Sequence, residues 1–191
     1  MKFILASSSP RRRQLLASIG AAFDVIASNV PEEHQRGEAP QDYVARLSRD
    51  KAQAVASQHR DRWVIAADTT VVLVGELLEK PADKADAVRM LAALAGKTHF
   101  VFTGVTIEND ARNYRDTQVA ETEVRILPLS SADIEWYVAT GEPMDKAGAY
   151  AAQGIGAVFI DSIHGSYTNV VGLPLALLFQ MLRKAGLDPL S

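Results

Sequence analysis

The sequence predicts an α/β fold, with a mixed, twisted central sheet flanked by helices and two lobes that have a substrate cleft between them. Three observations predict this class. Short apolar runs alternate with helical patterns in the first half, a long pair of β-rich segments follows, and an apolar helix lies near the C-terminus. No fixed-period repeat, low-complexity tract or linker interrupts the 191 residues, so we expect a single domain over residues 1–191.

The N-terminal stretch predicts a strand that leads directly into a helix. Residues 3–6, FILA, form a short apolar run of the kind found in buried strands. Ser9 suits the N-cap of a helix and Pro10 its first position, while Gly20 is a natural stop. We therefore expect a strand over residues 3–6 and a helix that starts at Pro10 and stops at Gly20.

The rest of the chain continues this alternation. Strands are predicted where β-branched and aromatic residues cluster, and helices where apolar residues recur every three to four positions. The predicted strands cover residues 23–27, 63–67, 69–74 with 77–78 as a hairpin, 98–108 with 117–127 as an antiparallel pair, and 157–163. The predicted helices cover residues 41–58, 82–94, 131–140 and 173–185, and residues 29–40 form a polar loop that we expect to be mobile.

The composition is that of an ordinary globular protein and excludes several function classes. A net charge of −3 gives no broad basic surface, so we expect no nucleic-acid partner. The absence of cysteine excludes disulfides, thiolate metal sites and a cysteine nucleophile. No signal-peptide pattern is present, and no apolar stretch approaches the roughly 18 residues of a membrane span. We therefore expect a cytoplasmic protein with no membrane partner.

Three consecutive arginines, Arg11 to Arg13, fall in the first turn of the predicted N-terminal helix. The N-terminal end of a helix carries a partial positive charge, so cations are disfavoured there. An anion bound at the free N–H groups would reverse that cost. Arg12 heads the apolar stripe that faces the core, and Arg11 and Arg13 flank it. The stretch predicts a phosphate or carboxylate site that uses Arg11 and Arg12, with Arg13 as a solvated residue.

Other polar residues each allow a functional and a structural interpretation. Asp68 directly follows an apolar run, where α/β proteins place ligand groups, although an aspartate there can also cap a turn. Lys51 shares a helix face with apolar residues, so it either reaches a site or lies with its stem along apolar surface. Glu32 and Glu33 lie in the polar loop, where most glutamates are solvated.

The arginines, lysines and carboxylates together favour phosphate chemistry with a hard cation. Lys80 precedes Pro81 and is expected in an extended segment that can face a cleft. The P-loop pattern is absent, and residues 153–156, QGIG, are too short for a dinucleotide fingerprint. The four histidines lack metal-ligand spacing, which argues against zinc. Because Mg²⁺ typically uses one or two carboxylates plus substrate phosphates, metal-assisted phosphoryl or nucleotidyl hydrolysis with a carboxylate base is expected.

Six stretches in sequence order span nearly the whole chain and carry a resemblance. They are residues 6–12 (ASSSPRR), 67–69 (ADT), 79–81 (EKP), 145–150 (DKAGAY), 153–154 (QG) and 171–174 (VGLP). Any one of them is a weak signal, whereas six in order are highly specific. Together they closely resemble the Maf family of nucleoside triphosphate pyrophosphatases.

The resemblance implies hydrolysis between the α- and β-phosphates of a nucleoside triphosphate, with a divalent cation, Mg²⁺ or Mn²⁺, as cofactor. It implies that Asp68 accepts the proton of the attacking water and that Glu32 and Asp68 hold the metal. Pro31 stands where the family often has an acidic residue, so Glu33 is an alternative to Glu32 as a ligand. The residues implied to bind phosphate oxygens are Ser7, Arg11, Lys51 and Lys80.

The family divides by base preference, and Arg12, Thr69 and Gln153 resemble the branch that acts on dTTP and UTP. Members that act on 7-methyl-GTP typically have tryptophan where Arg11 or Arg12 falls. An amide offers both donors and an acceptor to a pyrimidine edge. We expect a house-cleaning dTTP/UTP pyrophosphatase that also takes modified pyrimidine nucleotides, and the sequence allows a homodimer. Two alternatives stay open: a nucleotide-binding regulator of cell division and septum formation, and a pyrophosphatase for inosine-type purine nucleotides.

Overall fold

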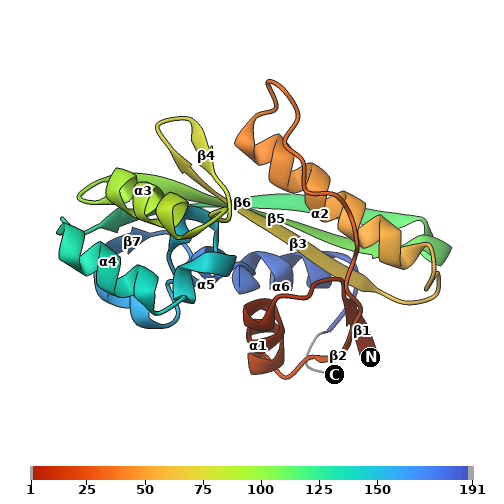
Figure 1. The fold of residues 1–191 in the computed structure, drawn as a ribbon. Helices are drawn as coiled ribbons and strands as arrows, with labels where there is room; N and C mark the ends of the chain where they lie inside the picture. The colour runs from red at the N-terminus through yellow and green to blue at the C-terminus, as the bar shows by residue number, and fades with distance from the viewer. Residues whose placement is uncertain (1, 189–191) are drawn as a thin grey trace. The chain divides into compact units, whose positions relative to one another are not determined.

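The computed structural model describes residues 2–188, which divide into two compact units. Unit 1 comprises residues 2–68, 103–120 and 172–188 of the described chain, and unit 2 comprises residues 69–102 and 121–171. The predicted class is confirmed, since a twisted, mixed sheet is flanked by helices (Figure 1). The single domain over residues 1–191 and the substrate cleft stay predictions.

The strands and helices alternate much as the sequence predicts. Within residues 2–188 the strands are β1 (Lys2–Leu5), β2 (Ala22–Val25), β3 (Val64–Leu73), β4 (Glu76–Leu78), β5 (Thr98–Asn109), β6 (Tyr114–Ile126) and β7 (Ile160–His164). The α-helices of the same range are α1 (Pro10–Ser18), α2 (Pro40–Ala56), α3 (Lys84–Leu94), α4 (Ser131–Ala139), α5 (Tyr167–Val171) and α6 (Leu175–Lys184). The strand order is β2-β1-β3-β5-β6-β7, with β4 beside β3. Strand β1 is parallel to β2 and β3, whereas β4 is antiparallel to β3 and β7 to β6.

Helix α1 begins and ends as its sequence predicts. The Ser9 side chain accepts a hydrogen bond from the Arg12 N–H at 3.4 Å, and Pro10 occupies the first turn. Gly20 adopts a φ of 74°, and its N–H donates to the Ala17 carbonyl at 3.0 Å. A glycine adopts this left-handed conformation without the steric cost that a Cβ brings, so it ends the helix.

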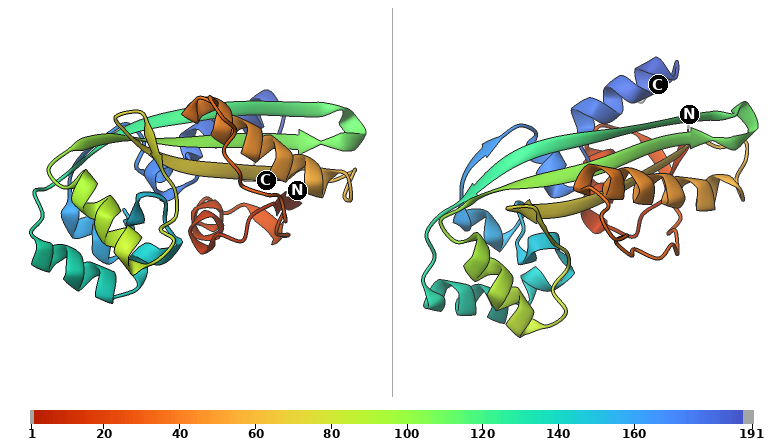
Figure 2. Two further views of the ribbon diagram at one scale, coloured as in Figure 1. Left: turned by 45° about the horizontal axis from the view of Figure 1, so that its top comes forward. Right: turned by 90° about the horizontal axis from the view of Figure 1, so that it is seen from above.

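Alternating side chains along β1 and β3 build two apolar layers in unit 1. One contains Phe3, Leu5, Ile65 and Ala67 together with residues of α1 and α6. The other contains Ile4, Ala6, Val64 and Ala66 together with Ala52, Val55 and Ala56 of α2. Figures 1 and 2 show α2 and α6 on opposite sides of the strands of this unit. Because successive side chains of a strand point to opposite faces, even-numbered residues of β3 in unit 1 face α2.

Helix α2 lies close to β5 in unit 1. A Cβ on Gly104 of β5 would lie 2.2 Å from the carbonyl oxygen of Val44, so only glycine permits this approach. Nearby, the hydroxyls of Ser48 and Thr106 are hydrogen-bonded at 2.9 Å, and Thr106 is 2.9 Å from the hydroxyl of Thr117 on β6. The close backbone approach and the hydroxyl chain fix α2 on the strands.

Unit 2 contains the predicted hairpin and its own core. Val71 pairs with Leu78 and Leu73 with Glu76 across β3 and β4, and the two-residue turn has positive φ at Val74 and Gly75. Apolar residues of α3 and α4 pack together with strand residues, and the core includes Tyr137, which is fully buried. The predicted hairpin and both predicted helices are confirmed.

Three details differ from the sequence-based prediction. The strand expected to end before Asp68 continues as β3 through Asp68 and Thr69, because the aspartate is paired with Lys51 and the threonine is β-branched. The last strand starts at Ile160 rather than residue 157, because residues 155–159 form a 3-10 turn. Helix α5 was not predicted, since its five residues are too few to show a helical period.

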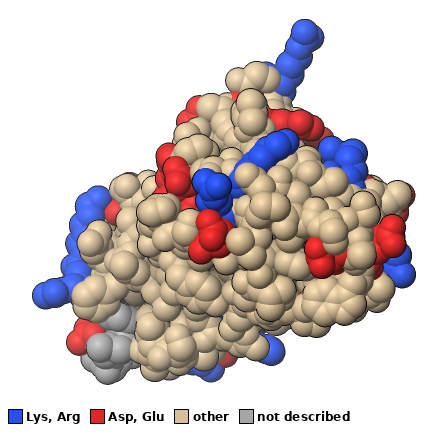
Figure 3. All heavy atoms as spheres, turned by 90° about the vertical axis from the view of Figure 1, so that its left-hand side faces the viewer, with Lys and Arg blue, Asp and Glu red and all other residues tan. Residues whose placement is uncertain are grey.

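Charge and hydropathy of the described residues agree with the composition. In the face drawn in Figure 3, basic and acidic side chains are interspersed among a majority of other residues. Within residues 2–188, none of the helices has the length and apolar character needed to cross a membrane.

Candidate active site

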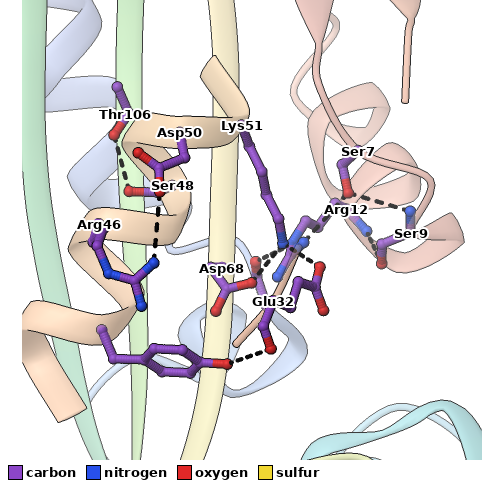
Figure 4. A network of polar contacts seen from close by, with 12 residues as sticks. Ser7, Ser9, Arg12, Glu32, Arg46, Ser48, Asp50, Lys51, Asp68 and Thr106 are labelled. Atoms are coloured by element: carbon purple, nitrogen blue, oxygen red, sulfur yellow. Dashed lines mark hydrogen bonds and ion pairs between the residues drawn. The ribbon is translucent and has the colours of Figure 1, made fainter. Parts of the chain in front are cut away.

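The polar site of unit 1 is centred on Lys51 of α2, whose side chain is only 7% exposed. Its Nζ donates to Asp68 Oδ1 at 2.6 Å and to Glu32 Oε1 at 2.5 Å (Figure 4). The Asp68 side chain is 9% exposed, whereas that of Glu32 is 42% exposed. We call these three residues the Lys51 network; it leads from the interior of unit 1 to its surface.

The fold explains why these side chains meet. Asp68 has the same parity on β3 as Val64 and Ala66, so it points toward α2. Lys51 lies four residues before Val55, on the buried face of α2. A long lysine stem can lie along apolar surface while its ammonium reaches a carboxylate. The side-chain alternation along β3 that builds the apolar layer against α2 therefore also places the Asp68 carboxylate opposite the Lys51 ammonium.

Glu32 reaches this network from the loop between β2 and α2. The Tyr43 hydroxyl donates to the Glu32 carbonyl at 3.4 Å, and Arg46 Nη2 donates to the Glu33 carbonyl at 2.9 Å. The Glu32 carboxylate contacts Lys51, whereas Glu33 holds the loop through its main chain. Between the two candidates for a metal ligand, the geometry favours Glu32, and ligation itself stays a prediction.

Arg12 and Ser7 form a second group of contacts in unit 1. Arg12 Nε donates to the Gly172 carbonyl at 2.8 Å, and Arg12 Nη1 donates to Ser7 Oγ at 3.3 Å. Ser7 Oγ also accepts from the Ser9 N–H at 3.2 Å. The Gly172 carbonyl thus ties the VGLP stretch to the SSSPRRR stretch. Sequence reasoning missed this contact, because a main-chain carbonyl leaves no signal of its own in a sequence.

The three arginines have different environments, as predicted. Burial lowers the pKa of Arg12, the negative charges of Asp68 and Glu32 oppose this effect, and the positive charge of Arg11 adds to it. A guanidinium nevertheless keeps its charge at any physiological pH. Arg12 is therefore a permanent positive charge in the field of the Lys51 network. Arg11 is partly exposed beside it, and Arg13 is exposed, which confirms Arg13 as a solvated residue.

The other predicted site residues belong to unit 2. Thr69 follows Asp68 on β3 and is partly exposed. Lys80 is exposed in the segment after β4, and Gln153 is exposed in the loop before the 3-10 turn of residues 155–159. Their roles in binding phosphate and base stay predictions.

The donor set of the Lys51 network fits a hard divalent cation. Two carboxylates, those of Asp68 and Glu32, are close enough to share one cationic group. Among the described residues, no group of three or more His, Asp or Glu side chains could hold a metal ion. Two carboxylates suit Mg²⁺ or Mn²⁺, since such ions take their remaining oxygen ligands from substrate phosphates and water.

The fold is shared with a solved protein of very different sequence. The structure of the Staphylococcus aureus Ham1 protein matches with a TM-score of 0.57 at 16% identity, over 97% of this chain and 100% of that chain. At such low identity the likeness defines a fold class, an α/β protein of the Ham1 type, and nothing narrower.

The sequence match is more specific, and the chain belongs to the Maf family. The family model described as Maf-like protein matches residues 2–185. A protein of Geobacter sulfurreducens is 52% identical over 97% of both chains, and one of Geobacter metallireducens is 54% identical over 97% of this chain and 96% of its own. A third, from Myxococcus xanthus, is 50% identical over 96% of this chain and 92% of its own. All three are named dTTP/UTP pyrophosphatase, and the predicted resemblance is confirmed.

Proposed function

We propose that this protein is a metal-dependent nucleoside triphosphate pyrophosphatase that hydrolyses dTTP and UTP, and modified pyrimidine nucleotides, as a house-cleaning enzyme. The observation that carries the proposal is the Lys51 network, in which a buried ammonium faces the carboxylates of Asp68 and Glu32. The names of relatives about half identical in sequence supply the substrate class. The enzyme would act in the cytoplasm, with no nucleic-acid or membrane partner.

The proposed chemistry uses Asp68 as the general base. Water attacks the α-phosphorus, and its proton moves to an Asp68 carboxylate oxygen. The new bond joins the water oxygen to phosphorus, the bond from the α-phosphorus to the bridging oxygen breaks, and pyrophosphate leaves with that oxygen. A positioned base of this kind typically contributes about 10²–10⁴ in rate.

The remaining residues hold the triphosphate. Lys51, Arg11 and Lys80 would offer N–H donors to phosphate oxygens, and Ser7 would offer its hydroxyl. Asp68 and Glu32 would hold Mg²⁺ or Mn²⁺, which when bound neutralises phosphate charge and increases the acidity of the attacking water.

Base selectivity is assigned to Arg12, Thr69 and Gln153. The hydroxyl and the amide can each donate and accept hydrogen bonds, so they can match the edge of a pyrimidine. A purine would leave such groups with unmatched partners, and this is the physical basis for strong discrimination.

A nucleotide panel with pyrophosphate detection tests the proposal. The purified protein is incubated with dTTP, UTP, CTP, GTP and ITP, with Mg²⁺ or Mn²⁺ and with a chelator in their place. We expect dTTP and UTP to release pyrophosphate only with metal. Preferential release from ITP would replace the proposal with a purine-directed enzyme, and the absence of turnover with every nucleotide would favour a nucleotide-binding regulator.

A further inference from the structure

In unit 2 the Glu142 carboxylate is surrounded by donors that the proposed chemistry does not use. Oε1 accepts from the Tyr137 hydroxyl at 2.8 Å and from the Gly156 N–H at 2.9 Å, and Oε2 accepts from the Ile155 N–H at 2.9 Å. Burial alone would raise the pKa of Glu142. The hydrogen bonds from the N–H groups of Gly156 and Ile155 and from the Tyr137 hydroxyl have the larger combined effect, so the pKa lies below its usual value. The carboxylate thus caps the start of the 3-10 turn of residues 155–159.

The backbone of this loop runs directly against the two side chains. Gly154 has a φ of 129°, and a Cβ there would lie 2.5 Å from Glu142 Oε2. A Cβ on Gly156 would lie 2.4 Å from the Tyr137 hydroxyl oxygen. Both glycines therefore permit an approach that a side chain would prevent. This explains the QGIG stretch, which fits no dinucleotide-binding pattern.

The contacts lie on both sides of Gln153. Before it, the Ala151 N–H donates to the Tyr137 hydroxyl oxygen at 3.1 Å, and the Ala152 carbonyl accepts from the Tyr167 hydroxyl at 3.3 Å. After it, the N–H groups of Ile155 and Gly156 bind Glu142 as described. A side chain at position 153 thus projects from a backbone that is held within two residues on each side.

We infer that Tyr137 and Glu142 are positioning residues that fix the backbone of residues 151–156 and thereby set where the Gln153 amide stands. The inference rests on the proposed function, because only there is Gln153 assigned to nucleotide selectivity. Tyr137 and Glu142 are then determinants of selectivity that act without touching the nucleotide.

The chemistry of the cluster explains why a carboxylate is needed. All three groups that face Glu142 are donors, so Glu142→Gln must present an amide NH₂ to at least one of them. In Tyr137→Phe the ring keeps its edge-to-face contact with Phe159, at 5.2 Å between centroids, while the links to Glu142 and Ala151 are lost. The two variants loosen the same loop from different sides and are tested in parallel, so the test survives if one of them fails to fold.

The first measurement is amide hydrogen exchange in the full-length protein. We expect at least one of the Ile155 and Gly156 N–H groups to exchange about tenfold faster in Glu142→Gln, because a factor of about ten is what one lost net hydrogen bond contributes. Glu135→Gln is the matched control, because Glu135 is an exposed glutamate on α4 of the same unit. Unchanged exchange at both amides overturns the inference.

The second measurement is selectivity, taken as the ratio of kcat/KM for dTTP to that for ITP. We expect the ratio to fall about tenfold in both variants and to change no further when either is combined with Gln153→Ala, because residues that act through one group are not additive. A purely structural role would lower both kcat/KM values together and leave the ratio unchanged, which overturns the inference. A wild-type protein that shows no preference for dTTP overturns the proposed function instead, and the exchange experiment still tests the anchoring.

Discussion

The two units hold their polar groups in different ways. At the Lys51 network of unit 1 the contacts join charged side chains, with the Lys51 ammonium shared between Asp68 and Glu32. In unit 2 the Glu142 carboxylate is held by a neutral phenol and two main-chain N–H groups. Charged side chains can exchange partners by rotating about their own bonds, whereas main-chain contacts fix the backbone itself. The first arrangement suits a site that must receive phosphates and a cation, and the second suits a loop that must keep its shape.

The largest effect is expected from removing the proposed base. Asp68→Asn keeps the size of the side chain but not its basicity, so kcat for dTTP should fall at least about 10²-fold. Asp110→Asn is the control, since Asp110 pairs with Arg60 in an exposed ion pair of the same unit. Steady-state kinetics with pyrophosphate detection measure both. Activity of Asp68→Asn within a few-fold of wild type would remove Asp68 from the mechanism.

Replacing the Lys51 ammonium tests how much the charged contacts of unit 1 stabilise the fold. Lys51→Met keeps the stem but leaves the Asp68 carboxylate buried without its cation, so the free energy of unfolding should fall by roughly 3 kcal/mol. Lys2→Met removes an exposed ion pair with Asp24, whose carboxylate keeps its contact with Arg62, and should cost less than about 1 kcal/mol. Urea unfolding measures both values. Equal stability of the two variants would mean that the Lys51 network is no more than a surface ion pair.

In unit 2, where neutral groups hold the Glu142 carboxylate, a buried histidine predicts that the free energy of unfolding depends on pH. His99 of β5 is fully buried beside the Tyr150 hydroxyl, and burial lowers its pKa from 6.5 to about 4. Between these values the unfolded chain binds a proton that the folded chain does not, so the free energy of unfolding falls as the pH falls. At the acid end of this window, the loss of unfolding free energy caused by His99 reaches roughly 3 kcal/mol.

Replacing the imidazole should remove this dependence. His99→Gln cannot titrate, so its unfolding free energy should fall less steeply than that of the wild type as the pH is lowered. Urea titrations at neutral and acid pH measure the difference between the two proteins, which cancels the contribution of the other acids. Parallel pH profiles would contradict a neutral, buried histidine.

The smallest effect is expected from the contact between α2 and β5. Gly104→Ala places a Cβ against the Val44 carbonyl, so we expect a loss of about 2 kcal/mol from the displaced helix. Because α2 carries Lys51, kcat should fall as well. Gly186→Ala, at a positive φ in open space, introduces backbone strain without the collision and should leave kcat unchanged. If both variants kept full activity, the docking of α2 on β5 would have no part in placing Lys51.

The sequence predicted what depends on local patterns. Ser9 and Pro10 marked the start of α1, and the apolar run of residues 63–67 marked the first part of β3. The predicted end of that strand at Asp68 was wrong, because the charge is neutralised by a residue 17 positions earlier in the chain, and such a pairing is not visible locally. For the same reason the partners of Arg12 and Glu142, which include main-chain groups far along the chain, could not be predicted.

The candidate site was predicted in part by resemblance. The structure brings Glu32, Lys51 and Asp68 together and joins Arg12 to Ser7, and the roles of these residues in metal, phosphate and base binding stay predictions. The sequence could not show which of Glu32 and Glu33 reaches Lys51, because adjacent loop residues with identical chemistry have the same sequence signal. The positioning of Gln153 could not be predicted from the sequence either, because it depends on how closely two glycines approach the side chains of Tyr137 and Glu142.

The uninterrupted course of β3 limits how this sequence can diverge. Asp68 is the last residue of unit 1 in this strand and Thr69 the first residue of unit 2, and a single peptide bond joins them. Substitutions in β3 change one side chain at a time, but a one-residue insertion or deletion before Asp68 would turn every later side chain to the opposite face. Ala67 or Thr69 would then stand opposite Lys51. We therefore expect related genes to vary in the length of their loops while this strand keeps its length.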